Sequence, residues 1–235
     1  MIKAIFFDFN GVIIDDEPLQ MCAYREVLRE HGIELTEENY YAALGMDDKT
    51  FVRAVFERSG RPLTPAALMS VQEGKTQLHR KMIEDELPLF PGVLTFLKAT
   101  SRRYALGLVS MSNSIEVGYV FERARLGPLF SVVVTAEDVT VCKPAPDCYQ
   151  RGLDKLNEKR QVERLLPLLP FECLAVEDSP PGIRSGRAAG MRTLGVTNTV
   201  SETELRAAGA DVVTASLADW TTDAICHVFD QGDSA

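Results

Sequence analysis

Apolar and polar positions along the chain alternate between short apolar runs and longer amphipathic stretches, a pattern typical of an α/β protein. The first run, residues 2–7, is apolar and rich in β-forming side chains, so it predicts a buried strand. Asp8 follows it directly, and Gly11 then lets the backbone turn before a second apolar run at 12–14. We therefore expect the carboxylate of Asp8 at the carboxyl edge of a sheet, where open α/β sheets place their chemistry.

Helical patterning replaces this strand pattern after Asp15. Apolar residues recur at helical spacing, and each stretch stops near a glycine or a proline. The expected helices cover residues 19–31, 36–44, 48–59 and 64–85. Four successive helices without a strand between them predict a separate helical bundle over about residues 16–88.

Strand and helix alternate from residue 89 to the end. Expected strands lie at 104–110, 131–135, 171–176, 193–196 and near 211–213, and expected helices reach about residue 100 and cover about 115–125, 146–157, 182–189 and 217–229. This alternation predicts a parallel sheet with helices on both faces. The expected fold class is α/β, with residues 1–15 and 89–235 forming the core domain and residues 16–88 inserted into it.

Composition and charge narrow the function classes. A chain of 235 residues that is 46% hydrophobic can bury a substantial core. The net charge of −9, without any dominant cluster of Lys and Arg, argues against a nucleic-acid-binding face. Five cysteines without a Cys-x-x-Cys pair suit a reducing cytoplasm, and no apolar run approaches the length of a membrane span. We expect a cytoplasmic protein without nucleic-acid or membrane partners, and the sequence leaves its oligomeric state open.

Two further motifs place polar residues beyond predicted strands. The run at 104–110 ends in Ser110, followed by Met111, Ser112 and Asn113, although serine at a strand end is ordinary turn chemistry when it stands alone. Lys143 begins a Lys-Pro-Ala-Pro-Asp stretch, whose prolines fix a loop before a helix and direct one ammonium toward the mouth of the sheet. There it would neutralise the carboxylate of Asp8. The alternative is a solvated surface lysine.

An acidic pair, Glu177 and Asp178, follows the apolar run at 171–176. Carboxylate oxygens that lie close together are the hard ligands that Mg²⁺ requires. The alternative is an ordinary helix N-terminus, since acidic residues are favourable there. The segment 182–190, which begins and ends in glycine, predicts a short helix packed closely on the sheet.

These four motifs, in this order across residues 1–196, resemble those of the haloacid dehalogenase superfamily, and in particular its helical-cap phosphatases close to β-phosphoglucomutase. The resemblance implies a Rossmann-like core with the helical bundle as its cap domain. It also implies that Asp8 is the nucleophile that forms an aspartyl-phosphate. Ser110, Lys143 and the backbone amides around Gly11 would then stabilise the phosphoryl oxygens.

The resemblance further implies a Mg²⁺ site. The carboxylates of Asp8 and Asp178 and the backbone carbonyl of Asn10 would bind the ion, and Glu177 would reach it through water. Dehalogenases of the superfamily share the Asp nucleophile but do not use Mg²⁺, so the acidic pair disfavours that activity.

Asn10 departs from the family pattern, which has an aspartate as general acid and base at this position. An amide keeps the shape of that side chain but cannot carry the proton. We therefore expect an attenuated phosphatase, slowest with poor leaving groups. The alternative is a pseudo-enzyme that binds a phosphorylated metabolite without turnover, and one chain does not reveal whether Asn10 is natural or engineered.

The choice of substrate depends on the cap. In β-phosphoglucomutases, cap residues hold a sugar and its second phosphate; the His position of that set falls on Gln20, the clamping Arg on or near Asp48, and the later Lys on Lys75. Gln20 and Asp48 depart from this set, and Asp48 has the opposite charge to the Arg it replaces, so a phosphomutase is disfavoured. Phosphonate hydrolases of the family use a cap lysine as a Schiff base, and Lys49 lies one position from where it is expected. An ordinary exposed lysine on a helix is the favoured interpretation of Lys49, so this activity is also disfavoured.

The expected function is thus hydrolysis of a small phosphorylated metabolite that the sequence does not name. Besides the catalytic and metal-binding residues, six residues are expected to bind substrate: Gly11, Gln20, Lys75, Met111, Ser112 and Asn113.

Overall fold

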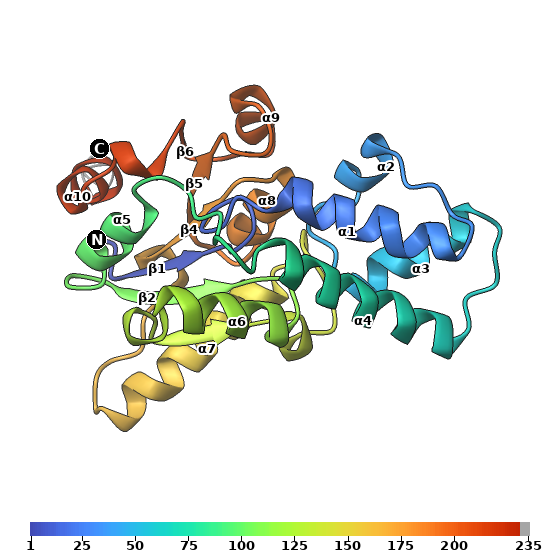
Figure 1. Cartoon of the computed structure of the whole chain (residues 1–235). Helices are drawn as coiled ribbons and strands as arrows, with labels where there is room; N and C mark the ends of the chain where they lie inside the picture. Colours follow the sequence, from blue (N-terminus) through green and yellow to red (C-terminus); the bar gives the residue numbers. More distant parts are fainter. Residues whose placement is uncertain (231–235) are drawn as a thin grey trace.

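The computed structural model describes residues 1–230, and a parallel sheet of six strands forms its centre (Figure 1). The strands are β1 (Ala4–Phe7), β2 (Ala105–Val109), β3 (Val132–Val134), β4 (Cys173–Glu177), β5 (Arg192–Val196) and β6 (Val212–Thr214), in the spatial order β3-β2-β1-β4-β5-β6. In the centre of this order, Phe7 of β1 pairs with Leu108 of β2 on one side and with Val176 of β4 on the other. The predicted α/β class is confirmed, and the carboxyl ends of β1, β2 and β4 lie side by side.

Helices cover both faces of the sheet. They are α5 (Val93–Thr100), α6 (Ser114–Ala124), α7 (Asp147–Val162), α8 (Pro180–Ala188), α9 (Glu202–Ala207) and α10 (Thr222–Asp230). Because successive strand residues point to opposite faces, Ile5 and Phe7 pack with α5, α6 and α10, whereas Phe6 packs against α7. Phe6 lies so close to Gly107 that a Cβ atom on that glycine would be 2.4 Å from its ring. The sheet is therefore buried on both faces, as parallel sheets require.

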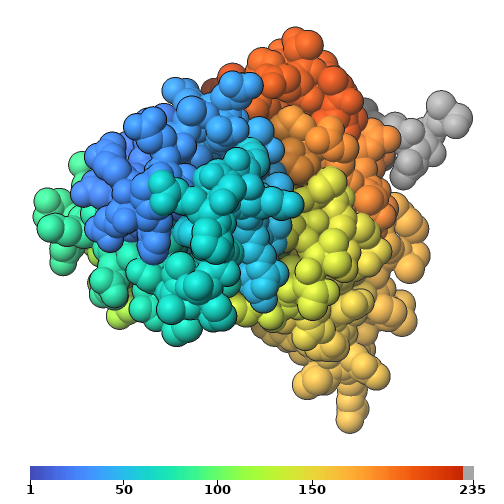
Figure 2. Space-filling view, turned by 90° about the vertical axis from the view of Figure 1, so that its right-hand side faces the viewer, coloured from blue at the N-terminus to red at the C-terminus, as the bar shows by residue number. Residues whose placement is uncertain are grey.

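Four helices between β1 and α5 form a second body: α1 (Glu17–Glu30), α2 (Glu37–Tyr41), α3 (Asp48–Arg58) and α4 (Pro65–Met82). They enclose an apolar cluster of their own, which includes Tyr24, Leu28, Phe51 and Val71. Figure 1 shows this body, blue to teal, beyond one end of the sheet, and Figure 2 shows it lying directly against the yellow part of the core. The four helices match the predicted bundle, and the domain boundaries at residues 16 and 88 stay a prediction.

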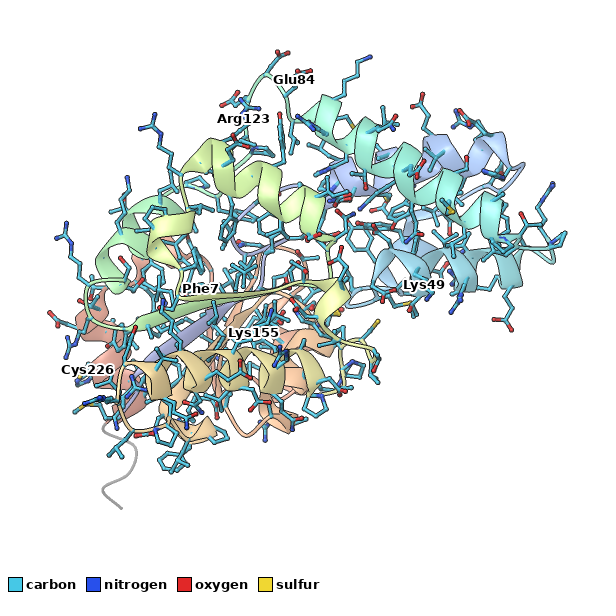
Figure 3. The ribbon with its side chains drawn as sticks, turned by 90° about the horizontal axis from the view of Figure 1, so that it is seen from below. Phe7, Lys49, Glu84, Arg123, Lys155 and Cys226 are labelled. Atoms are coloured by element: carbon cyan, nitrogen blue, oxygen red, sulfur yellow. The ribbon has the colours of Figure 1, made fainter. Side chains whose placement is uncertain are left out.

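The bundle is also tied to α6. The guanidinium of Arg123 donates hydrogen bonds to the backbone carbonyls of Ile83, at 3.0 Å, and Glu84, at 2.5 Å, just beyond the end of α4 (Figure 3). The carbonyl of Ile83, the C-cap residue, is one that a helix leaves unpaired at its C-terminus.

Helices α2 and α4 each end three residues before the expected residues 44 and 85, and two further helices also differ from the sequence prediction in extent. α7 continues five residues past the expected end at residue 157, because the added residues Glu158 to Val162 are mostly good helix formers although they lack an apolar stripe. The helix expected at 217–229 is divided into a short 3-10 turn, Leu217–Asp219, and α10.

The short helix α9 was not predicted. Its signal is a capping box, in which the Ser201 hydroxyl accepts from the backbone of Glu204 while the Glu204 carboxylate accepts from the backbone of Ser201. None of the helices within residues 1–230 is long and apolar enough to cross a membrane.

Candidate active site

Lys143 joins the ends of three neighbouring strands. Its ammonium lies 2.9 Å from Oδ1 of Asp8 and 2.7 Å from Oε1 of Glu177, and it donates to the backbone carbonyl of Val109 at 3.3 Å. The Lys143 side chain is almost fully buried, whereas that of Asp8 keeps 14% of its surface exposed. The loop after β3 therefore places the ammonium where the sequence predicted it, in the mouth of the sheet.

Three carboxylates gather around this ammonium. Oxygen atoms of Asp8, Glu177 and Asp178 all lie within 4.8 Å of one another, and Glu177 and Asp178 are buried. Burial and the negative charge of Asp8 raise the pKa of both buried carboxyl groups well above their usual range. Among the described residues, Lys143 is the cation that faces these three acids, so the cluster contains more negative than positive groups.

Glu177 is oriented by its neighbours. Its Oε1 accepts from the hydroxyl of Tyr149 at 2.5 Å as well as from Lys143, and its Oε2 has no hydrogen-bond partner within residues 1–230. A Cβ atom at Gly182 would lie 1.9 Å from that Oε2, so only glycine lets α8 approach the carboxylate. The sequence predicted this close packing of α8 on the sheet.

Gly11 forms the turn beside Asp178. Its φ is +73°, a conformation that favours glycine, and a Cβ atom there would lie 1.9 Å from Oδ2 of Asp178. Its backbone N–H donates to the carbonyl of Ile14 at 2.9 Å, and its own carbonyl accepts from Asn198 at 2.7 Å. In this structure the Gly11 amide, predicted to face the phosphoryl group, is used within the turn.

A cavity lies next to Asp8, between the sheet and the helical bundle, and the residues after β2 form one of its walls. Met111 and Ser112 line it, whereas Ser110 is fully buried and its Oγ accepts from the backbone N–H of Ser112 at 3.0 Å. Asn113 caps α6 by accepting from the backbone N–H of Glu116 at 2.9 Å. Of these four predicted site residues, two lie on the cavity wall and two support it.

Asn10 has its side chain fully engaged. Its Nδ2 donates to both carboxylate oxygens of Asp16 at 2.9 Å, and its Oδ1 accepts from Oγ of Ser112 at 2.5 Å. Asp16 is completely buried; it also accepts from Nε2 of Gln20 at 3.0 Å and lies 2.9 Å from Nε2 of His79. The contact between Asn10 and Asp16 could not be predicted from the sequence.

All three cap residues singled out in the sequence, Gln20, Asp48 and Lys75, line the same cavity. Lys75 does not extend freely into it, because its ammonium lies 2.9 Å from the carboxylate of Glu116 and 3.1 Å from that of Asp48. Lys49, the alternative candidate on the cap, is exposed on α3 and lies outside the cavity (Figure 3).

Several cavity residues on the cap were not predicted from the sequence, among them Glu17, Tyr24, Tyr40 and Phe51. Glu17 opens α1 and accepts from the hydroxyl of Tyr40 at 2.6 Å. Burial, followed by the negative charge of Asp16, raises the pKa of Glu17 to about 7. Its position in the run Asp15-Asp16-Glu17 was visible in the sequence, but which of the three acids faces the cavity was not.

The chain is similar in sequence to known hydrolases and phosphatases. A family model described as haloacid dehalogenase-like hydrolase matches residues 2–190. A phosphorylated carbohydrates phosphatase of Thermotoga maritima is 30% identical over 211 residues, which cover 86% of this chain and 88% of that protein. A fructose-1-phosphate phosphatase of Escherichia coli is 28% identical over 192 residues, covering 82% and 95%.

Solved structures show the same fold. A β-phosphoglucomutase from Clostridium difficile superimposes with a TM-score of 0.84 over 98% of both chains, at 20% sequence identity. At this level of identity the likeness concerns the fold and carries no statement about substrate.

Proposed function

Because the chain belongs to the haloacid dehalogenase-like hydrolase family, we propose that it is a Mg²⁺-dependent phosphatase that transfers the phosphoryl group of a small phosphate ester to Asp8. The observation that carries the proposal is the placement of Asp8: its carboxylate faces the cavity at the carboxyl end of β1 and is paired with the buried ammonium of Lys143. The named relatives, which act on phosphorylated carbohydrates and fructose 1-phosphate, support a small phosphorylated metabolite as the substrate.

The proposed reaction has two steps. A carboxylate oxygen of Asp8 attacks phosphorus, the bond from phosphorus to the leaving oxygen breaks, and an aspartyl-phosphate forms. Water then attacks that phosphorus and gives up a proton to the group that protonated the leaving oxygen, which releases inorganic phosphate and restores the carboxylate. Lys143 offsets the charge of Asp8 and of the transferring group throughout, as preorganised cations do in phosphoryl transfer.

The acidic cluster fits a divalent cation. Its donors are hard carboxylate oxygens, one cation faces three of them, and Oε2 of Glu177 has no partner within the described residues. Asp8, Asp178 and the backbone carbonyl of Asn10 would hold Mg²⁺, with Glu177 acting through water. When bound, Mg²⁺ supplies positive charge next to the phosphoryl oxygens.

Proton transfer to the leaving oxygen needs a group other than Asn10. Asp15 is exposed and Asp16 is enclosed by Asn10, Gln20 and His79, and neither lines the cavity, whereas Glu17 does. We therefore assign to Glu17 the role of protonating the leaving oxygen. Its pKa of about 7 suits the gain and loss of a proton near neutral pH.

The experiment that tests the proposal is a phosphate-release assay on a panel of phosphorylated metabolites, with and without Mg²⁺. We expect Mg²⁺-dependent release that is abolished in Asp8→Asn. The competing interpretation, a protein that binds phosphorylated metabolites without turnover, predicts that vanadate binds while no ester is hydrolysed. Release that persists unchanged in Asp8→Asn would contradict the assigned nucleophile.

A further inference from the structure

The cavity contains few positive charges, and each is already compensated. Within residues 1–230, its lining includes two cationic side chains, Lys75 and Lys143. Lys143 lies between Asp8 and Glu177, at the phosphoryl end. Lys75 comes from α4 of the cap and therefore faces the rest of the substrate.

Lys75 has no hydrogen-bonding capacity left for a ligand. Its Nζ donates to both oxygens of Glu116, at 2.9 and 3.0 Å, and to Oδ1 of Asp48 at 3.1 Å, which accounts for all three donors of an ammonium. Burial lowers the pKa of Lys75, but the two carboxylates outweigh it and raise the pKa overall. Lys75 therefore stays charged and stays paired.

Glu116 is held in place from several sides. Thr76 donates to its Oε1 at 2.8 Å, Asn113 at 3.1 Å, and Gln20 donates to its Oε2 at 3.3 Å. Its pKa is lowered to about 2, because Lys75 and then His79 outweigh the effect of burial. Withdrawing Lys75 toward a ligand anion would leave this carboxylate buried and poorly compensated, which is costly.

The part of the cavity lined by helices α1–α4 is here called its cap end, and its wall also carries acidic and aromatic residues. Asp48 brings a carboxylate and Glu17 a carboxyl group to it, and the rings of Tyr24, Tyr40 and Phe51 lie beside them together with the uncharged residues 43–46. The Tyr24 and Phe51 ring centroids are 4.4 Å apart, and those of Tyr40 and Phe51 are 5.9 Å apart. Such a wall suits hydroxyl groups, C–H groups or a cationic nitrogen, whereas a second anion would meet like charge.

We propose that the cap end of this cavity selects phosphate monoesters whose leaving group is neutral or cationic, such as a polyol or an amino alcohol, and rejects esters with a second phosphate or a carboxylate. This inference rests on the proposed function, since it describes the leaving-group end of the same site. The paired Lys75 is what distinguishes this cavity from one that would bind a bisphosphate.

Binding of matched esters tests the inference independently of turnover. Titration calorimetry on Asp8→Asn with Mg²⁺ compares glycerol 3-phosphate with 3-phosphoglycerate, and ethanolamine phosphate with phosphoglycolate. In the first pair a carboxylate replaces a hydroxymethyl group, and in the second pair it replaces an aminomethyl group, which is cationic. We expect the ester without the carboxylate to bind about tenfold tighter or more in both pairs.

Variants of Glu116 and Asp48, the residues that pair with Lys75, test the inference in a second way. Glu116→Gln and Asp48→Asn each release part of the charge of Lys75, so each should reduce or reverse the preference. Asp48 is only partly buried, so Asp48→Asn tests the point even if Glu116→Gln does not fold. Glu73→Gln is the matched control, because it changes the net charge equally on an exposed position of α4 and should leave the preference unchanged.

Equal or tighter binding of the carboxylate esters to the otherwise unaltered cavity would overturn the inference. The same holds if Glu116→Gln and Asp48→Asn both fold and both keep the full preference. If the preference is found while the unaltered protein hydrolyses none of the esters of the panel, the proposed function fails and the selectivity stands.

Discussion

Asn10 shows how one residue is matched to its surroundings. Its amide donates to both oxygens of the buried Asp16, so an aspartate at position 10 would place two carboxylates about as close as the 2.9 Å that now separates donor and acceptor. Two carboxylates at that distance cannot both ionise freely. Asn10 and Asp16 therefore act as a pair, and restoring the family's aspartate alone would disturb the site.

The first prediction follows from this pair. Asn10→Asp should destabilise the protein by about 1–3 kcal/mol, and more at pH 8 than at pH 5, because the introduced carboxyl group must stay protonated next to Asp16. The exchanged pair Asn10→Asp with Asp16→Asn should recover stability. Because Glu17 is assigned the proton transfer, the exchanged pair should change the turnover of alkyl phosphates by less than about tenfold. Thermal melts at the two pH values check the first part, and equal melting temperatures for Asn10→Asp and the unaltered protein would contradict it.

Glu17 gives a second prediction at this scale. The folded state raises its pKa from 4.5 to about 7, so its contribution to stability is fully present below pH 4.5 and is lost as the pH rises through 7. Glu17→Gln cannot ionise. In metal-free protein its melting temperature relative to the unaltered protein should therefore increase from pH 5 to pH 8.

The same variant tests the role of Glu17 in proton transfer. Glu17→Gln should lower kcat for alkyl phosphates by roughly 10²-fold or more, while aryl phosphates, which leave without a proton, should change little. An equal loss for both ester types would mean that Glu17 only supports binding.

At the scale of elements, the sequence predicted more about strands than about helix contacts. Apolar runs followed by polar residues were sufficient to place Asp8 and the acidic pair at one edge, because parallel strands end together. The prolines next to Lys143 indicated the loop that brings its ammonium to the same edge. The pairing of Lys75 with Glu116 could not be predicted. It joins α4 to α6 across 41 residues, and Glu116 has the ordinary appearance of an acid in the first turn of a helix.

Lys143 provides the prediction that belongs to this scale, since it joins the loop after β3 to the ends of β1 and β4. Lys143→Ala would leave Asp8 and Glu177 without their shared cation, which should destabilise the metal-free protein by about 3–5 kcal/mol and abolish vanadate binding. Chemical denaturation and vanadate titration measure the two effects. If vanadate binds Lys143→Ala with unchanged affinity, Lys143 does not belong to the phosphate site.

For the whole molecule, alternation of strands and helices was enough to predict the sheet and the inserted bundle. The cavity itself was not predictable, because its walls combine α1, α2, α3 and α4 of the bundle with loops that follow β1, β2, β3 and β4. Residues from such distant segments meet only once the bundle rests on the sheet. Glu17, Tyr40 and Phe51 were missed for this reason.

Metal binding should couple these segments. Mg²⁺ held by Asp8 after β1 and Asp178 after β4 would stabilise the folded state in proportion to its occupancy. We expect Mg²⁺ to raise the melting temperature of the unaltered protein but not that of Asp178→Ala. A rise of the same size in both would place the metal elsewhere.

The most direct test of the central claim is to look for the phosphoryl group on Asp8. The protein is mixed with an aryl phosphate and Mg²⁺, quenched in acid within the first turnover, and analysed by intact-protein and peptide mass spectrometry. The account predicts an added phosphoryl group on the peptide that contains Asp8, absent without Mg²⁺ and absent in Asp8→Asn. Hydrolysis of the ester without any such adduct, or an adduct that persists in Asp8→Asn, would contradict it.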